Sequence, residues 1–153
     1  MILGLDPGLK GGYALLDDGK IIQSGAFSVD GGLIQTAQFV EAIRLHTPEP
    51  VMAIIEQVHA MPGQGVTSMF SFGKGFGQLI GVCQALKWPF VLVTPQAWKG
   101  KVLAGTPKDK DAAIAFVRAR YPEVNLTQPG CRTLHDGVAD AVCLAHYGAT
   151  LCR

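Results

Sequence analysis

The sequence predicts an α/β domain in which a mixed five-stranded sheet carries helices on both faces. Three short apolar runs open the chain with turn signals between them, which indicates an antiparallel meander. Two further apolar runs alternate with segments of helical spacing, a pattern typical of strands covered by helices. The chain has 153 residues. This length suits one substantial core, and we expect residues 1–153 to form a single domain.

The three opening strands are each bounded by turn residues. Residues 2–6 form a continuous apolar run that ends in Asp-Pro-Gly, where proline fixes φ and glycine permits a reversal. Residues 11–17 and 20–28 are the next two predicted strands. The sequence Asp-Asp-Gly-Lys between them is a hairpin signal. We therefore expect three consecutive antiparallel strands.

The rest of the chain alternates between helical and strand patterns. Residues 51–56 and 90–94 are apolar runs beside prolines and are predicted as strands. Residues 60–74 are rich in glycine and are predicted to form an irregular loop. Thr106 precedes a proline and is expected to cap a helix. The predicted helices cover residues 33–46, 75–86, 95–98, 107–121 and 135–147.

Composition excludes several classes of protein. Hydrophobic residues make up 48% of the chain and charged residues 16%, which argues against disorder. No apolar stretch reaches the roughly 18 residues of a membrane-spanning helix, and no signal peptide is recognisable, so we expect a cytoplasmic protein without a membrane partner. The cysteines form no CxxC pair and are expected to be reduced thiols. They are Cys83, Cys131, Cys143 and Cys152.

Four carboxylates lie at the polar ends of apolar segments. Asp6 ends the first predicted strand and Glu56 ends the fourth, while Asp136 and Asp140 lie one turn apart near the start of the last helix. Buried carboxylates need a partner, and for a cluster that partner is commonly a hard divalent cation. Two such ions about 4 Å apart can hold the attacking and leaving oxygens of a phosphodiester displacement. The pattern therefore predicts a metal-dependent nuclease.

Each carboxylate also has a purely structural interpretation. Asp6 could cap the turn before proline and glycine. Glu56 could belong to a buried salt bridge. Asp136 could compensate the dipole at the start of the last helix. All four being structural together is less probable than any one of them, so the nuclease interpretation stands first.

Six of the thirteen basic residues lie in one segment, residues 99–120. All four carboxylates lie outside this segment. A net charge of +1 is unlike that of a protein that coats DNA, but local placement of charge matters more than the sum. We therefore expect a negative metal pocket beside a positive substrate rim. The six residues are Lys99, Lys101, Lys108, Lys110, Arg118 and Arg120.

Three motifs resemble those of the RuvC family of Holliday-junction resolvases, which has an RNase H-like fold. Ile-Leu-Gly-Leu-Asp-Pro-Gly at residues 2–8 is similar to the first strand of that family. Ile-Ile-Glu-Gln-Val at 54–58 is similar to its second catalytic motif, and Asp-Gly-Val-Ala-Asp-Ala at 136–141 to its last helix. The glycine-rich segment 63–77 and the Ala-Trp-Lys element at 97–99 resemble most the phage-type and chloroplast-type branch.

This resemblance implies a homodimeric endonuclease that resolves four-way DNA junctions. It implies two Mg²⁺ ions per active site, for which Mn²⁺ can substitute. By resemblance, Asp6, Glu56, Asp136 and Asp140 are metal ligands and catalytic residues, and Lys110 acts beside them at the scissile phosphate.

A further set of residues is expected to contact the junction, Lys99 by the same resemblance and the apolar ones from their place beside the glycines of residues 63–77. Basic residues would bind the backbone, and an apolar side chain of the glycine-rich loop would wedge between base pairs. The residues expected to bind DNA are Lys74, Lys99, Lys101, Lys108, Met69, Phe70 and Phe72.

The chain departs from the family pattern at two positions. The bacterial enzymes usually have a carboxylate three residues before the last one, where this chain has Gly137. Asp136 stands one residue earlier with His135 beside it, so the third ligand is one of these two. Bacterial members often have an aromatic wedge three residues after the glutamate, where this chain has His59.

Other functions remain open on the sequence alone. An RNase H-like nuclease could act on hybrids or other branched substrates, and a nuclease-dead DNA-binding module could share the fold. The second case would be favoured by loss of an acidic residue, and none is missing. An actin-like ATPase or sugar kinase also opens with a strand and Asp-x-Gly, but it needs a second domain that we do not expect here.

Overall fold

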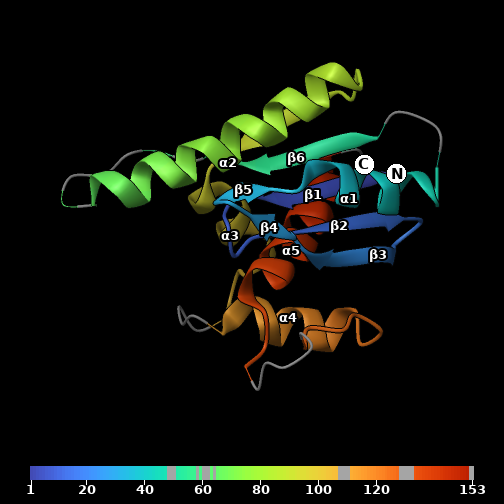
Figure 1. The fold of residues 1–153 in the computed structure, drawn as a ribbon. Coiled ribbons are helices and arrows are strands. Elements are labelled where there is room, and N and C mark those ends of the chain that lie inside the picture. The colour runs from blue at the N-terminus through green and yellow to red at the C-terminus, as the bar shows by residue number, and fades with distance from the viewer. Residues whose placement is uncertain are drawn as a thin grey trace.

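The computed structural model describes residues 1–47, 51–57, 59, 63, 65–106, 111–127 and 133–151. A five-stranded sheet with strand order β3-β2-β1-β6-β7 forms its centre (Figure 1). β1 is antiparallel to β2 and β2 to β3, whereas β1, β6 and β7 run parallel. The mixed five-stranded sheet and its opening meander are therefore confirmed. The strands are β1 (Ile2–Asp6), β2 (Gly12–Asp17), β3 (Lys20–Ala26), β6 (Met52–Glu56) and β7 (Phe90–Val93).

Helices and a small hairpin complete the described part of the chain. The hairpin pairs β4 (Val29–Asp30) with β5 (Leu33–Ile34). No helix within the described residues is both long and apolar enough to cross a membrane. The helices are α1 (Thr36–Arg44), α2 (Val66–Ala85), α3 (Pro95–Val102), α4 (Ala112–Arg120) and α5 (Asp136–Leu151).

Alternate side chains of the strands enter two separate cores, one on each face of the sheet. Leu3 and Leu5 of β1 pack in the core that α1 and α2 cover. Ile54 of β6 packs in the other core, with residues of α3, α4 and α5. This alternation follows from the two-residue period of a strand. The predicted helices on both faces of the sheet are therefore confirmed.

α5 lies directly on the sheet, and α4 packs against α5 (Figure 1). The close approach depends on Gly4 in β1. A Cβ at Gly4 would collide with the carbonyl oxygen of Ala141 and the amide nitrogen of Ala145. The absence of a side chain there lets the two backbones touch, so the start of α5 comes close to the end of β1.

The prediction of a loop over residues 60–74 is wrong for the second half of this segment, which is helical. α2 begins at Val66 and extends beyond the ends of the sheet strands (Figure 1). Met69, Phe70 and Phe72 therefore lie on a helix and not in a loop.

Packing explains why α2 forms despite its glycines, which lower helix propensity. Leu79 and Cys83 of α2 are fully buried against the sheet. The side chain of Gln78 makes two hydrogen bonds of 3.0 Å with the backbone of Ile34 in the hairpin. These tertiary contacts join segments far apart in sequence, and local patterns do not report them.

Two helix starts also differ from the prediction. The helix expected over residues 33–46 begins at Thr36, because the hairpin takes up the first two positions. Thr106 does not cap the fourth helix, which begins at Ala112. The hydroxyl of Thr106 instead donates a hydrogen bond of 2.7 Å to the carbonyl oxygen of Leu103, where α3 ends.

Candidate active site

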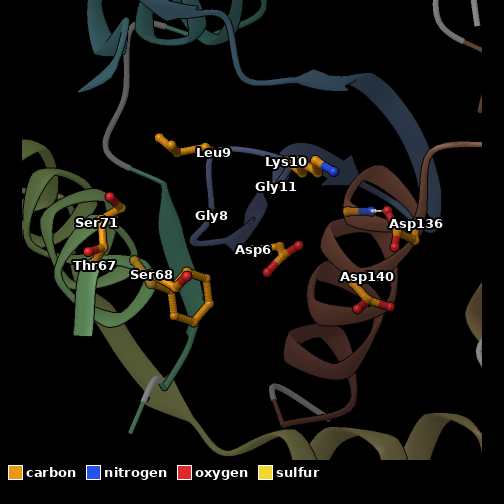
Figure 2. A pocket seen from close by; sticks show the side chains of 12 residues that line it. Asp6, Gly8, Leu9, Lys10, Gly11, Thr67, Ser68, Ser71, Asp136 and Asp140 are labelled. Carbon is orange, nitrogen blue, oxygen red and sulfur yellow. Dashed lines mark hydrogen bonds between the residues drawn. The ribbon is translucent and has the colours of Figure 1, made fainter. Parts of the chain in front are cut away.

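Three separate elements bring four carboxylates to one end of the sheet. Asp6 is the last residue of β1, and Glu56 is the last residue of β6, its parallel neighbour. Parallel strands end at the same edge of a sheet, so these two side chains lie close together. Asp136 and Asp140 face Asp6 from the first two turns of α5 (Figure 2). The structure thus gathers the four acidic residues that the sequence predicts as ligands.

The first turn of α5 rests on the loop that follows β1. Gly137 forms a parallel bridge with Gly11. A Cβ at Gly137 would collide with the carbonyl oxygen of Lys10. A carboxylate at this position therefore has no room, which gives a physical reason for the acidic residue at Asp136 instead.

A cavity of about 560 Å³ lies between α5 and the first turns of α2 (Figure 2). Asp6, Asp136 and Asp140 line it on one side. Glu56 does not line the cavity, and its charge reaches the site from the neighbouring strand. The other residues that line it are Gly8, Leu9, Lys10, Gly11, Thr67, Ser68, Ser71, Phe72 and Gly137.

The sequence interpretation missed the hydroxyl groups of this cavity. Thr67, Ser68 and Ser71 fall in the segment predicted as an irregular loop, in which side chains have no common direction. On a helix, Ser71 lies one turn after both Thr67 (i, i+4) and Ser68 (i, i+3), so it neighbours both, and all three line the same cavity as the carboxylates. A correct start for α2 would have revealed the row. Lys10 was likewise missed as a basic residue of the site.

Burial and mutual repulsion raise the pKa values of the clustered carboxylates. Burial is the main reason that the pKa of Asp6 lies well above its ordinary value, and the charges of Glu56, Asp140 and Asp136 add to it. Burial, followed by the charge of Asp140, raises the pKa of Glu56. Burial also raises the pKa of Asp140 to about 6. Lys99 opposes all three shifts.

The donor set suits a hard divalent cation. Carboxylate oxygens are the ligands that Mg²⁺ and Mn²⁺ prefer, and four carboxylates exceed the charge of Lys99. Among the described residues, no three His, Cys, Asp or Glu side chains are placed to hold one ion by themselves. Mg²⁺ usually keeps several waters and binds through one or two carboxylates together with substrate phosphates. An open acidic site of this kind therefore fits Mg²⁺ with a substrate phosphate as a further ligand.

His135 serves as a helix cap. Its Nδ1 accepts a hydrogen bond of 3.0 Å from the amide of Val138 in the first turn of α5. Burial lowers the pKa of His135, which favours a neutral ring. With Nδ1 engaged as an acceptor, a neutral ring carries its proton on Nε2 and has no free lone pair for a metal. Asp136, in contrast, is exposed and lines the cavity, and its role as the third ligand stays a prediction.

The structure places the predicted DNA-binding lysines at different distances from the carboxylates. The charge of Lys99 acts directly on the cluster. Lys101 instead lies over the ring of Tyr147 at 5.7 Å, well along α5 from the cavity. Lys74 lies over the ring of Phe70 at 5.3 Å on α2. Lys108, Lys110, Cys131 and Cys152 lie outside the described residues.

The described aromatic residues and cysteines also have different surroundings. Phe70 is 69% exposed, whereas Phe72 lines the cavity and packs against the loop at Gly8. Met69 is half-buried. Cys83 and Cys143 are buried free thiols, as predicted for them.

The acidic cluster should destabilise the metal-free protein near neutral pH. Asp6 and Asp140 keep their protons in the folded state at pH values where the unfolded chain has lost them, so stability falls as pH rises through this window, upward from about pH 4. We expect Asp6→Asn to raise the melting temperature of the metal-free protein at about pH 7, with a smaller gain near pH 4. Mg²⁺ should then stabilise the wild type more than the variant. Differential scanning fluorimetry tests this, and a variant less stable than wild type at neutral pH would contradict it.

Comparisons with known proteins identify the fold. No family model and no curated protein sequence matches this chain. RuvC from Thermus thermophilus, solved in complex with a Holliday junction substrate, matches with a TM-score of 0.68 and 15% identity, over 99% of this chain and 94% of that one. Fowlpox virus resolvase, solved with substrate Holliday junction DNA, matches with a TM-score of 0.51 and 13% identity, over 99% of both chains.

A third solved structure extends this likeness. The yeast mitochondrial Holliday junction resolvase matches with a TM-score of 0.58 and 17% identity, over 99% of this chain and 80% of that one. Identities this low show a shared fold, and the predicted RNase H-like architecture is confirmed. The narrower likeness to phage-type and chloroplast-type enzymes stays a prediction.

Proposed function

We propose that this protein is a metal-dependent endonuclease that resolves four-way DNA junctions by paired phosphodiester hydrolysis. The observation that carries the proposal is the gathering of Asp6, Glu56, Asp136 and Asp140 beside an open cavity, with the charge of Lys99 acting on the cluster. Support for the substrate comes from the shared fold, since two of the similar structures hold Holliday junction DNA. An acidic site suited to phosphodiester chemistry thus occurs on a fold that junction resolvases use.

The residues of the site divide the work of hydrolysis. The four carboxylates would hold Mg²⁺ or Mn²⁺, two ions per site. When bound, such ions lower the pKa of water and neutralise charge on the reacting phosphate. Asp6 and Glu56 are fixed on adjacent strands, which hold their positions more rigidly than loops do. Lys99 is exposed and can neutralise the phosphate as charge develops, and we infer the same role for Lys110.

The opposite side of the cavity offers a path for the DNA backbone. Hydroxyl groups and lysines are common partners of phosphate oxygens. Thr67, Ser68 and Ser71 on α2, and Lys10 in the loop after β1, present such groups in the cavity that the carboxylates line (Figure 2). A DNA strand that lies in this cavity would therefore have its phosphates between the hydroxyl donors and the acidic site.

A homodimer fits the symmetry of the substrate. A four-way junction has two equivalent scissile strands, so a two-fold dimer places one active site on each. We infer this assembly, and a cytoplasmic location, from the substrate and the sequence.

Competition binding tests the choice of substrate. The Glu56→Gln variant, mixed with a labelled four-way junction, avoids cleavage during the measurement. We expect unlabelled junction to displace the label far better than linear duplex, fork or RNA–DNA hybrid of equal length. Affinity should fall steeply with salt, because lysines displace condensed counterions. If linear duplex competed as well as the junction, the junction-resolving function would be refuted. If RNA–DNA hybrid competed better than the junction, an RNase H-like activity would be favoured.

The exposed aromatic residue of α2 should distort the junction. Phe70 stands free on the helix with Lys74 over its ring, so it can enter between base pairs and offset the cost of unstacking. We expect Phe70→Ala to change stability by less than about 0.5 kcal/mol, as for surface positions, yet to abolish the fluorescence rise of 2-aminopurine at the junction centre.

Phe72→Ala provides the contrast, because Phe72 packs against the loop at Gly8. This variant should lose stability. Phe70→Leu should keep part of the fluorescence signal. A full signal from Phe70→Ala would exclude Phe70 as the wedge and point to Met69 or Phe72.

A further inference from the structure

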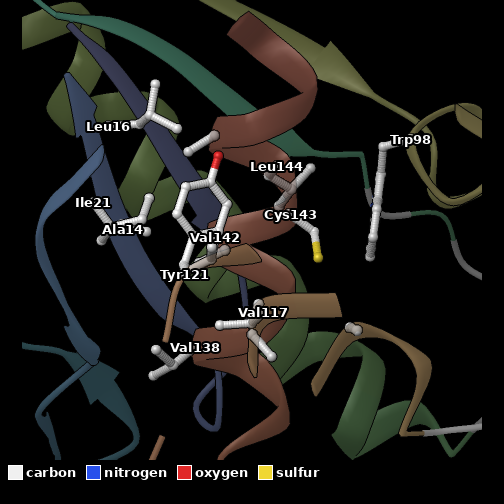
Figure 3. Packing of buried hydrophobic residues seen from close by; sticks show 14 of the residues in the cluster. Ala14, Leu16, Ile21, Trp98, Val117, Tyr121, Val138, Val142, Cys143 and Leu144 are labelled. Atoms are coloured by element: carbon white, nitrogen blue, oxygen red, sulfur yellow. The ribbon is translucent and has the colours of Figure 1, made fainter. Parts of the chain in front are cut away.

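Trp98 is a buried residue with an unpaired donor. Its side chain is completely buried in the core between the sheet, α3 and α5, the same core that holds Cys143 (Figure 3). Its indole N–H is the one buried side-chain polar group, among the residues that the structure describes, without a hydrogen-bond partner. Buried donors are nearly always paired, and phenylalanine or leucine could fill an apolar core without this cost. The indole at this place therefore calls for an explanation.

The local structure places this donor beside Glu56. Val93 ends β7 and pairs with Glu56, and the amide of Gln57 donates to the carbonyl oxygen of Val93 at 2.7 Å. α3 starts immediately afterwards, and the hydroxyl of Thr94 caps it. Trp98 thus lies in the first turns of a helix fixed to the strand end that carries Glu56. The indole N–H lowers the pKa of Glu56 as a side-chain donor, although it forms no complete hydrogen bond.

The ring of Trp98 contacts the positive group of the same site. The ammonium nitrogen of Lys99 lies 5.0 Å from the centroid of the indole ring. A cation over an indole face is attracted by the ring quadrupole, most strongly for tryptophan. One buried side chain therefore acts on a carboxylate of the acidic cluster and lies against its cation.

We infer that Trp98 is a positioning residue, whose indole N–H orients the carboxylate of Glu56 while its ring holds Lys99 near the cluster. The inference rests on the proposed function. A carboxylate has two oxygens. A hydrogen-bond donor on one oxygen therefore leaves the other oxygen free to bind a metal ion or a water molecule. Groups that orient ligands in this way typically affect metal affinity or activity by about 10–100-fold.

Nuclear magnetic resonance tests the contact without any cleavage. The chain has two tryptophans, so a ¹H–¹⁵N spectrum of the metal-free protein holds two indole signals. Trp88→Phe identifies the Trp98 signal by elimination. We expect Glu56→Gln to shift this signal strongly, and Glu41→Gln on the exposed side of α1 to leave it in place. An unmoved Trp98 signal in Glu56→Gln would overturn the inference.

The functional part is tested with Trp98→Phe, which keeps an aromatic ring and removes the N–H. We expect its kcat to fall by about 10–100-fold, with junction affinity unchanged. The affinity for Mn²⁺ without DNA, followed by electron paramagnetic resonance, should fall as well. Trp88→Phe is the matched control, because Trp88 is buried in the other core. This variant should keep the wild-type kcat and the wild-type affinity for Mn²⁺.

The outcomes separate this inference from the proposed function. Wild-type kcat and Mn²⁺ affinity in Trp98→Phe would overturn the positioning role. If Trp98→Phe does not fold, the indole signal of the intact protein still decides whether the contact exists. A protein that shows the indole shift and the Mn²⁺ effect, yet cuts no junction, would retain Trp98 as a positioning residue and refute the resolvase function.

Discussion

Asp6→Asn and Glu56→Gln should each lower the rate of junction cleavage at least about 1000-fold, in the range found for catalytic groups that act as a unit. Both substitutions keep the size and shape of the side chain and remove its negative charge. They therefore leave the fold intact and remove a ligand from the acidic cluster. Binding of the junction should stay at the wild-type level or become tighter, because a carboxylate no longer repels the phosphates.

Single-turnover cleavage and binding by fluorescence anisotropy, measured on the same preparations, test this result. Asp30→Asn and Glu41→Gln are matched controls, since both residues are exposed and lie on the hairpin and on α1. The controls should cut at the wild-type rate. Cleavage by Asp6→Asn or Glu56→Gln at a rate close to wild type would show that the acidic cluster is not the active site.

Asp136→Asn should lower the cleavage rate by about 100-fold or more if Asp136 is a ligand, a loss at the upper end of the range for groups that support a metal site. His135→Ala should cost less activity and more stability. The imidazole caps α5 through the amide of Val138, and loss of a cap costs roughly 1 kcal/mol. The two variants therefore differ in which property they change.

Urea unfolding and single-turnover cleavage of both variants separate the two roles. His135→Asn is a useful control, because asparagine caps helices well and should restore most of the stability lost in His135→Ala. If His135→Ala proved inactive and Asp136→Asn active, the third ligand would be His135, and the cap would be a secondary function.

The strands and the acidic cluster could be predicted because local patterns determine them. Residues 2–6 and 51–56 are short apolar runs that end in a charged side chain, which marks both the strand and the edge where it ends. Asp136 and Asp140 share a helix side by spacing alone. Two parallel strands and one helix then have few ways to arrange four carboxylates other than together.

The features that were missed depend on contacts between distant parts of the chain. α2 starts after Gly65, which provides no side-chain cap, and the helix is held by burial of Leu79 and by the hydrogen bonds between Gln78 and Ile34. The row of hydroxyl groups became visible only with that helix in place. The inferred pairing of Trp98 with Glu56 likewise joins α3 to β6, and nothing in the Ala-Trp-Lys element itself indicates it.

A supercoiled plasmid that extrudes a cruciform tests the central claim most directly. The cruciform is a four-way junction, and cutting both strands within one encounter converts the plasmid to linear DNA, whereas cutting one gives a nicked circle. We predict linear product with Mg²⁺ or Mn²⁺, little with Ca²⁺, and none with a chelator or with Glu56→Gln. A matched plasmid without the inverted repeat should stay supercoiled. Nicked circles in equal amounts from both plasmids would contradict paired cleavage of a junction, and with it the proposed function.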